Sequence, residues 1–357
     1  MQKDMHFYGI YALARAAGIQ PETAKNIACA SQFVDDAIED EAIVLDGENK
    51  RAVLPTMTSH RPIDYQNTIP GDQWKVWVPF HFLPGNDENA QTFPGKMVCL
   101  KDSKPAGKML DHALKYKKDS FGPHLAGITA HVYADTFAHY GFTGLSRDWN
   151  RVQNDSIDIR GSDFITNYLW HKFETFKTRV AGSLAEAVPV GHGSVGTFPD
   201  RPYLHWEYEY ESIEKYGSRG KVVRNNLNDF MEASERLHTF FGNFIQDNST
   251  HGDPVSPVTW DSIADRVHDI LETEGTLDER IELWKRAISS ADLFDPTDED
   301  RIISYSEKLW KSDHVIYHFS KGGTVDNSDA CLFFRAAWKH RNYVLHELLP
   351  EVELIAY

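Results

Sequence analysis

Residues 122–140 constrain the fold more than any other part of this sequence. The segment, GPHLAGITAHVYADTFAHY, is apolar apart from a few histidines and one aspartate. On a helix of about 100° per residue, the side chains of His131, Asp135 and His139 lie on one face, and His124 falls on the same face. The other faces are apolar, so this helix must be buried and its polar stripe must be satisfied inside the protein.

Two readings of this stripe stay open. Neutral imidazole nitrogens and carboxylate oxygens spaced four residues apart on a helix are ligands that divalent cations bind, and a bound ion would offset the cost of burying them. The alternative is a buried hydrogen-bond network of His131, Asp135 and His139 without any metal. Because such clusters are often functional sites, we expect a metal.

The remaining periodicity predicts a mainly α protein: a multi-helix bundle with a long irregular, partly strand-like insertion at residues 46–121. The strand-like part is the run 74–78, WKVWV. We expect a metal-site helical domain at 1–221 and a helical C-terminal region at 222–357 packed on it, or one single domain. Helices are expected at 6–17, 21–40, 122–140, 161–188, 225–246, 257–273, 277–289, 298–311 and 327–348.

Composition narrows the function classes. The 357 residues carry 53 acidic and 37 basic side chains, a net charge of −16, which disfavours binding to duplex nucleic acid. The three cysteines are far apart and outside any C-x-x-C arrangement, so a metal site here would use nitrogen and oxygen ligands. No apolar stretch approaches a membrane span and no export signal is recognised, so the expected location is cytoplasmic.

A second group of candidate ligands lies near the N-terminus. Asp4 and His6 open the first expected helix, and Asp35 and Asp36 end the second. An antiparallel helical hairpin would bring the two groups together. Glu39 and Asp40 are better explained as a solvated helix end, and the sequence leaves open whether Asp35 or Asp36 faces the site.

The loops supply further candidates. His60 and His81 lie in the insertion, and either could be a metal ligand. The glycine-rich segment 191–202 holds His192 and Asp200, either of which could complete a metal shell. The side chains expected to bind substrate are Arg201, Trp77 and His124, and Arg61 is expected to assist catalysis by holding an anionic group.

Two resemblances rest on these motifs. An early histidine, an aspartate about thirty residues later, a further histidine and then HVYADTFAH resemble the zinc-dependent phospholipase C and single-strand nuclease superfamily, whose members are mostly helical hydrolases with clustered zinc ions. More closely, the segments MQKDMHFY (1–8), FVDD (33–36), VPFHFLPG (78–85) and HVYADTFAH (131–139) resemble an uncharacterised family found in bacteria and fungi. This second resemblance covers most of residues 1–210 and implies no activity.

The superfamily resemblance implies a ligand arrangement. His6 and Asp135 would bind one ion, and Asp135 would bridge to a second ion held by His131, by Asp35 or Asp36, and by His60 or His81. His139 would begin a third site, but it follows Asp135 after three intervening residues where the superfamily usually has five. The superfamily also uses its terminal amine as a ligand after export, whereas this sequence starts at Met1 without a signal. A mono- or dinuclear site is therefore expected.

The function expected from these features is hydrolysis of a phosphoester with a divalent metal such as Zn²⁺, with Fe or Mn as alternatives. Asp35 or Asp36 would accept the proton of the attacking water. A non-haem iron oxidative enzyme is the first alternative, and a non-catalytic protein with a structural metal is the second. The expected partners are a small-molecule or phosphoester substrate and a second copy of the chain.

Overall fold

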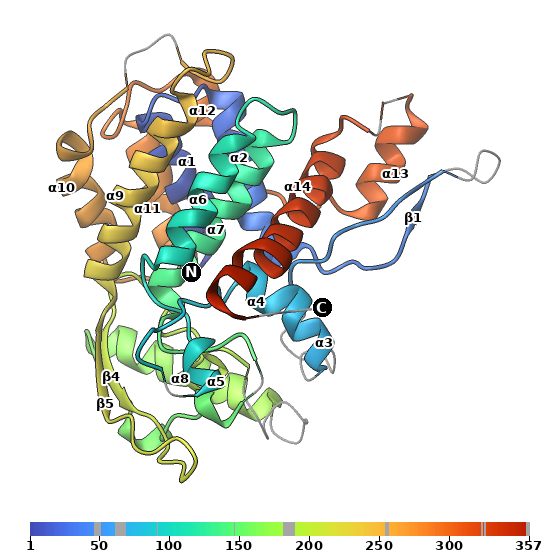
Figure 1. Cartoon of the computed structure of the whole chain (residues 1–357). Helices are drawn as coiled ribbons and strands as arrows, with labels where there is room; N and C mark the ends of the chain where they lie inside the picture. The colour runs from blue at the N-terminus through green and yellow to red at the C-terminus, as the bar shows by residue number, and fades with distance from the viewer. Residues whose placement is uncertain are drawn as a thin grey trace.

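The fold is built around one buried helix, α7 (Gly122–His139), as the computed structural model shows (Figure 1). Every residue of α7 is buried, and α2, α6, α9 and α14 pack around it. The structure describes residues 1–45, 51–60, 69–90, 92–145, 147–180, 190–253, 257–322, 324 and 326–354. The prediction of a mainly α protein is confirmed.

The N-terminal half starts with a π-helical turn, η1 (Asp4–Gly9), which continues directly into α1. The principal helices are α1 (Ile10–Ala16), α2 (Pro21–Asp36), α6 (Lys104–Lys115), α8 (Asp163–Val180), α9 (Asn226–Ile245), α10 (Trp260–Glu272), α11 (Leu277–Ser289), α13 (Ser312–Ser320) and α14 (Asp329–Tyr343). Shorter ones are α3 (Pro70–Asp72), η3 (Gln73–Trp77), α4 (Val78–Phe80), α5 (Phe93–Lys96) and α12 (Asp298–Arg301). No helix in the described ranges is long and apolar enough to cross a membrane.

Helices α2 and α7 approach each other closely, and a glycine permits this. A Cβ added at Gly127 would lie 2.2 Å from the carbonyl oxygen of Ile27 and 2.7 Å from the Cβ of Ala30. Both distances are too short for a side chain. The close approach brings the C-terminal turn of α2, which carries Asp35, beside His131 on α7.

In the described ranges, two small antiparallel sheets complete the fold. The strands β1 (Ile43–Val44) and β2 (Ala52–Val53) form a hairpin. The strands β3 (Asp158–Arg160), β4 (His205–Glu209) and β5 (Lys221–Asn225) form the second sheet, in which Trp206 pairs with Ile159 on one side and Arg224 on the other. This second sheet, together with α8, surrounds a smaller apolar cluster that includes Phe142, Phe173 and Phe198. The sequence had not indicated this sheet.

The expected character of the insertion is partly wrong. The run 74–78 is helical, because Gln73 and Val76 are buried at helical spacing and Pro70 starts the helix. Tertiary packing here overrides the strand propensity of the Trp and Val side chains. Helix α6 also lies within 46–121, where we expected irregular structure, and Ser103 caps its N-terminus by accepting a hydrogen bond from the Ala106 amide.

The C-terminal half differs from expectation at two places. The helix expected at 298–311 ends after α12, so that Tyr305 lies outside the helix and donates to Asp36. The region from 222 onward, expected to be helical, begins with β5 at residues 221–225, and the helix expected at 225–246 follows as α9. The division of the chain at residue 221 stays a prediction, and the main apolar core takes residues from both sides of it, from Met1 to Leu354.

Candidate metal centre

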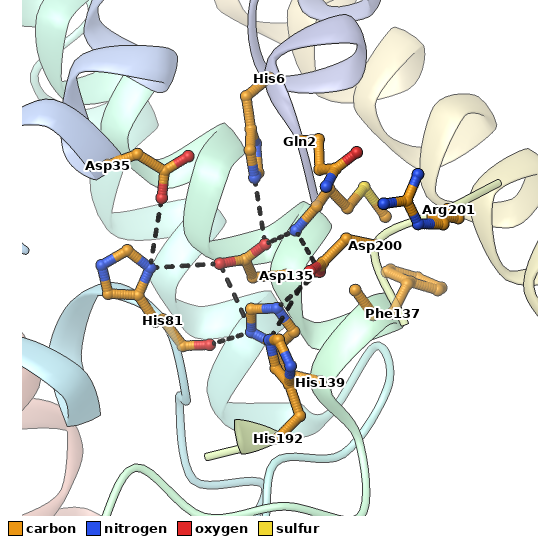
Figure 2. Close-up of polar contacts among 12 residues, drawn as sticks. Gln2, His6, Asp35, His81, Asp135, Phe137, His139, His192, Asp200 and Arg201 are labelled. Atoms are coloured by element: carbon orange, nitrogen blue, oxygen red, sulfur yellow. Dashed lines mark hydrogen bonds and ion pairs between the residues drawn. The ribbon is translucent and has the colours of Figure 1, made fainter. Parts of the chain in front are cut away.

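The candidate centre is organised around Asp135, whose carboxylate is almost completely buried (Figure 2). Its Oδ1 lies 2.6 Å from the N-terminal amine and 3.2 Å from His6 Nε2. Its Oδ2 lies 3.2 Å from His131 Nε2 and 3.5 Å from His139 Nδ1. The two oxygens therefore face different sets of nitrogen atoms, which is the arrangement that a bridging carboxylate needs.

The first ligand group consists of His81, His131 and Asp135. Asp135 Oδ2 is 3.5 Å from His81 Nδ1 and 3.2 Å from His131 Nε2, and the two nitrogens are 3.3 Å apart. Zinc bonds of about 2.0 Å in a tetrahedron place ligand atoms about 3.3 Å from one another. The three donor atoms thus already have the spacing that a tetrahedral ion requires.

The tautomer of His81 is fixed by its surroundings. His81 Nε2 lies 2.9 Å from the carbonyl oxygen of Thr58, and a carbonyl can only accept, so Nε2 carries the proton and donates. Thr58 is itself anchored to the end of α2 by its hydroxyl, which donates to the carbonyl of Val34. The unprotonated Nδ1 of His81 therefore points at His131 and Asp135, the geometry typical of metal-ligating histidines.

The second ligand group consists of His139, His192 and Asp200. His139 Nε2 lies 3.3 Å from Asp200 Oδ1, and His192 Nε2 lies 3.9 Å from Asp200 Oδ2. Both rings donate through Nδ1 to a backbone carbonyl, His139 to that of His81 at 2.8 Å and His192 to that of Gly196 at 2.7 Å. Their Nε2 atoms are thereby turned toward Asp200.

A third grouping, His6, Asp35 and His131, overlaps the first. The His6 ring stacks on the His131 ring with centroids 3.8 Å apart. The N-terminal amine lies between the first two groups, 2.6 Å from Asp135 Oδ1 and 3.2 Å from Asp200 Oδ1. In this structure the amine is the cation that links the two buried carboxylates.

Charges and burial hold these donors in the states that a cation requires. Burial acts against charge on Asp135 and Asp200, but the nearby amine and histidines hold the pKa of both carboxyl groups well below the usual range. Burial lowers the pKa of His6 well below its ordinary value and that of His192 to about 4. Burial also acts against charge on the N-terminal amine, yet Asp135 and Asp200 raise its pKa to about 11. At neutral pH Asp135 and Asp200 are therefore ionised, and His6 and His192 are neutral, which are the states in which they can bind a cation.

The structure distinguishes the two aspartates at the end of α2. Asp35 Oδ1 lies 3.9 Å from both His81 Nδ1 and His131 Nε2, and its side chain is 35% exposed. Asp36 instead accepts hydrogen bonds from the Tyr305 hydroxyl at 2.6 Å and from Gln32 Nε2 at 3.2 Å, and it belongs to none of the ligand groups among the described residues. Burial raises the pKa of Asp35.

The other residues that the sequence predicted as ligands or substrate contacts belong to none of these ligand groups among the described residues. His60 is buried beside the Trp77 ring, which also packs against His81, but His60 joins none of the described ligand groups. His124 lies nearly two turns before His131 on α7, where it contacts Asp329 and Trp310. Arg201 is buried directly after Asp200, and Arg61 lies outside the described residues.

Sequence reasoning missed what holds the N-terminal segment in place. Arg280, on α11, donates to Asp4 Oδ2 at 2.7 Å and to the Gln2 side chain at 2.5 Å. Asp4, considered above as a candidate near the metal, is thus an ion-pair partner. Nothing in a single sequence links residues 276 positions apart, although the pairing satisfies a buried charge on each side.

Comparison with known proteins places the chain in a family. It belongs to a family of unknown function (DUF6765), which it matches over residues 1–348. This confirms the resemblance to an uncharacterised family. Searches of curated proteins and of solved structures found no match to the chain.

Proposed function

We propose that this member of the DUF6765 family is a metal-dependent hydrolase that acts on a phosphoester through two neighbouring metal positions. One observation carries the proposal: His81, His139 and His192 each donate outward to a backbone carbonyl and turn the other ring nitrogen toward a buried aspartate. An ionised aspartate can only accept, so a hydrogen bond to it from one of these inward nitrogens would need a second proton on the ring, whereas a nitrogen lone pair in this position suits a cation.

Each position would have three protein ligands. His81, His131 and Asp135 would hold the first ion, and His139, His192 and Asp200 the second, with Asp135 beside both. Three protein ligands leave a fourth place open, as in catalytic zinc sites, whereas structural sites have four. Divalent ions in such a pair lower the pKa of water and stabilise the negative charge that develops on a phosphoryl group.

Asp35 is the proposed proton acceptor. It lies at the edge of the first ligand group, too far from His81 and His131 for a tight tetrahedron but close enough to face the open place. Its partial exposure gives access to water, and its raised pKa brings the carboxyl closer to the pH at which general bases work well. Asp36 would take no part in the chemistry.

The donor chemistry also keeps an oxidative enzyme as a second candidate. His81, His131 and Asp135 make up the two-histidine, one-carboxylate set that non-haem iron enzymes use. The second ligand group next to this set favours hydrolysis, because paired ions clamp a phosphoryl group. The order of these ligands along the chain also resembles that in the zinc-dependent phospholipase C and nuclease superfamily.

The test compares Asp35→Asn with its neighbour Asp36→Asn. Both proteins are loaded with zinc, checked for metal content and assayed on a panel of chromogenic phosphomonoesters and phosphodiesters. We expect Asp35→Asn to keep its metal and to lose about 100-fold or more of the hydrolysis rate, with Asp36→Asn close to the wild type. Absence of hydrolysis by the zinc-loaded wild type, or an iron content instead of zinc, would contradict the proposal.

A further inference from the structure

Arg201 is a buried charge for which the described residues provide no counter-ion. Only 4% of the residue is exposed, and its Nε and Nη1 atoms have no hydrogen-bond partner in the described part of the chain. Among the described residues, its side chain makes one hydrogen bond, from Nη2 to the Thr197 hydroxyl at 3.1 Å. Burying an ionised group without a partner is costly, so an unpaired buried guanidinium calls for an anion from elsewhere.

Within the described ranges, the other deeply buried arginines, unlike Arg201, have carboxylate or carbonyl partners. Arg15 pairs with Asp300 and Asp253, Arg280 pairs with Asp4, and Arg224 donates to the carbonyl groups at the end of α7. Arg201 follows Asp200 directly, yet the carboxylate of Asp200 faces His139 and the N-terminal amine instead. Among the described residues, the guanidinium of Arg201 therefore has no carboxylate partner.

The position of Arg201 is fixed in advance of any ligand. The carbonyl of Arg201 accepts a hydrogen bond from Asn226 Nδ2 at 2.8 Å, and the same amide group also donates to the carbonyl of Phe198. The guanidinium lies over the Tyr168 ring at 5.7 Å. In Figure 2 the guanidinium group is turned toward Gln2, and Arg201 lies closer to Asp200 than to His81. A group held in this way loses little entropy on binding.

We infer that Arg201 is a substrate-specificity residue that binds an unesterified phosphate oxygen beside the second metal position. The choice of phosphate rests on the proposed function; the need for an anion rests on Arg201 alone. A guanidinium forms strong charge-assisted hydrogen bonds with phosphate, and Nε and Nη1 together supply three free N–H groups. Two divalent ions would also outweigh the three carboxylates of the ligand groups, so the occupied centre would favour an anionic substrate over a neutral ester or amide.

The experiment measures binding of inorganic phosphate to the full chain by calorimetry, with and without zinc. The variants are Arg201→Gln and, as the control, Arg219→Gln, which changes an arginine that packs on Trp149 and Tyr210 outside the ligand groups. We expect Arg201→Gln to keep its zinc and to bind phosphate about 10-fold or more weakly, and Arg219→Gln to bind it like the wild type. If Arg201→Gln binds phosphate as tightly as the wild type, the inference is wrong, while the metal proposal stands.

Two further outcomes separate the inference from the proposed function. If the wild type takes up no zinc, the metal proposal fails, and phosphate binding that depends on Arg201 in the metal-free protein would still support the inference. If the wild type binds no phosphate in either state, the inference fails. Should Arg201→Gln not fold, Thr197→Val takes its place, because it removes the hydroxyl that holds Nη2. Weaker phosphate binding by Thr197→Val supports the inference, and unchanged binding overturns it.

Discussion

His81 Nδ1 and His131 Nε2 lie 3.3 Å apart, and both face the same oxygen of Asp135. The outward hydrogen bond of His81 to the Thr58 carbonyl leaves a lone pair on its inward nitrogen. Nitrogen and oxygen lone pairs converging at this spacing are stabilised by a cation between them. Of the two histidines of the insertion that the sequence left as alternatives, His81 belongs to this ligand group, and we propose it as the ligand.

We therefore expect His81→Gln to weaken zinc binding and His60→Gln to leave it unchanged. Loss of a direct ligand should cost more than the about 10- to 100-fold that loss of an outer hydrogen-bond partner costs. Both histidines are buried in the same part of the fold, so general destabilisation affects both variants. Zinc affinity measured by competition with a chelating dye checks this. Equal losses in the two variants would count against the assignment of His81.

Because α2 packs closely on α7 at Gly127, a side chain at this position should destabilise the protein. Gly127→Ala places a methyl group against the carbonyl of Ile27, so it should destabilise the protein by about 1–3 kcal/mol and separate Asp35 from His131. Gly107→Ala, on α6, meets no atom within 4 Å and should be neutral or stabilising by up to about 1 kcal/mol. Urea unfolding measures both. A Gly127→Ala protein as stable as the wild type would show that the two helices are not held this close.

The ion pair between Arg280 and Asp4 holds the N-terminal segment in place, so removing Arg280 should destabilise the protein. Arg280→Met leaves Asp4 buried without its partner and should lower the free energy of unfolding by about 3–5 kcal/mol. Arg286→Met, at an exposed position on the same helix, should change it by about 0.5 kcal/mol or less. The double variant Arg280→Met/Asp4→Asn should regain part of the loss, and no recovery would argue against the ion pair as the cause.

Acid should destabilise the fold partly through His112, whose ring stacks on Tyr343 with centroids 3.5 Å apart. Burial lowers the pKa of His112 to about 3 in the folded protein, against about 6.5 when unfolded. The unfolded state binds the extra proton, so this contribution is complete above pH 6.5 and is lost as the pH falls toward 3. His112→Phe keeps the stacking and should reduce the loss of stability between pH 7 and pH 4.5.

Urea midpoints at these two pH values measure the effect. His346→Gln, which alters an exposed histidine in the turn after α14, serves as the control and should follow the wild type. A His112→Phe protein that loses as much stability as the wild type on acidification would contradict the assignment.

Helix periodicity in the sequence predicted much of the fold and the helix at the centre of the site. The spacing of His131, Asp135 and His139 on an otherwise apolar helix predicted α7 and its burial, because the argument needs only local geometry. The run 74–78 was predicted wrongly, because burial of Val76 and Gln73 outweighs local strand propensity. The sheet β3–β4–β5 was missed because its strands are short and β3 lies far from β4 in the sequence.

The choice among candidate ligands needed tertiary structure. Asp35 and Asp36 are neighbours in the sequence, and only the direction of the last turn of α2 sends one toward His131 and the other toward Tyr305. The pairing of Arg280 with Asp4 likewise depends on the docking of α11 against the N-terminal segment. His192 and Asp200 had been named from a glycine-rich loop, and the structure brings them to His139.

The most direct test of the central claim is the metal content of the protein purified without a metal-affinity tag, measured by elemental mass spectrometry for the wild type, Asp135→Asn and Asp36→Asn. Asp135 lies beside both ligand groups, whereas Asp36 contacts Tyr305. The account predicts that wild type and Asp36→Asn take up two equivalents of zinc, and that folded Asp135→Asn loses them. A wild type that remains free of metal after incubation with zinc, iron or manganese would contradict it and leave a hydrogen-bonded core network in place of the metal centre.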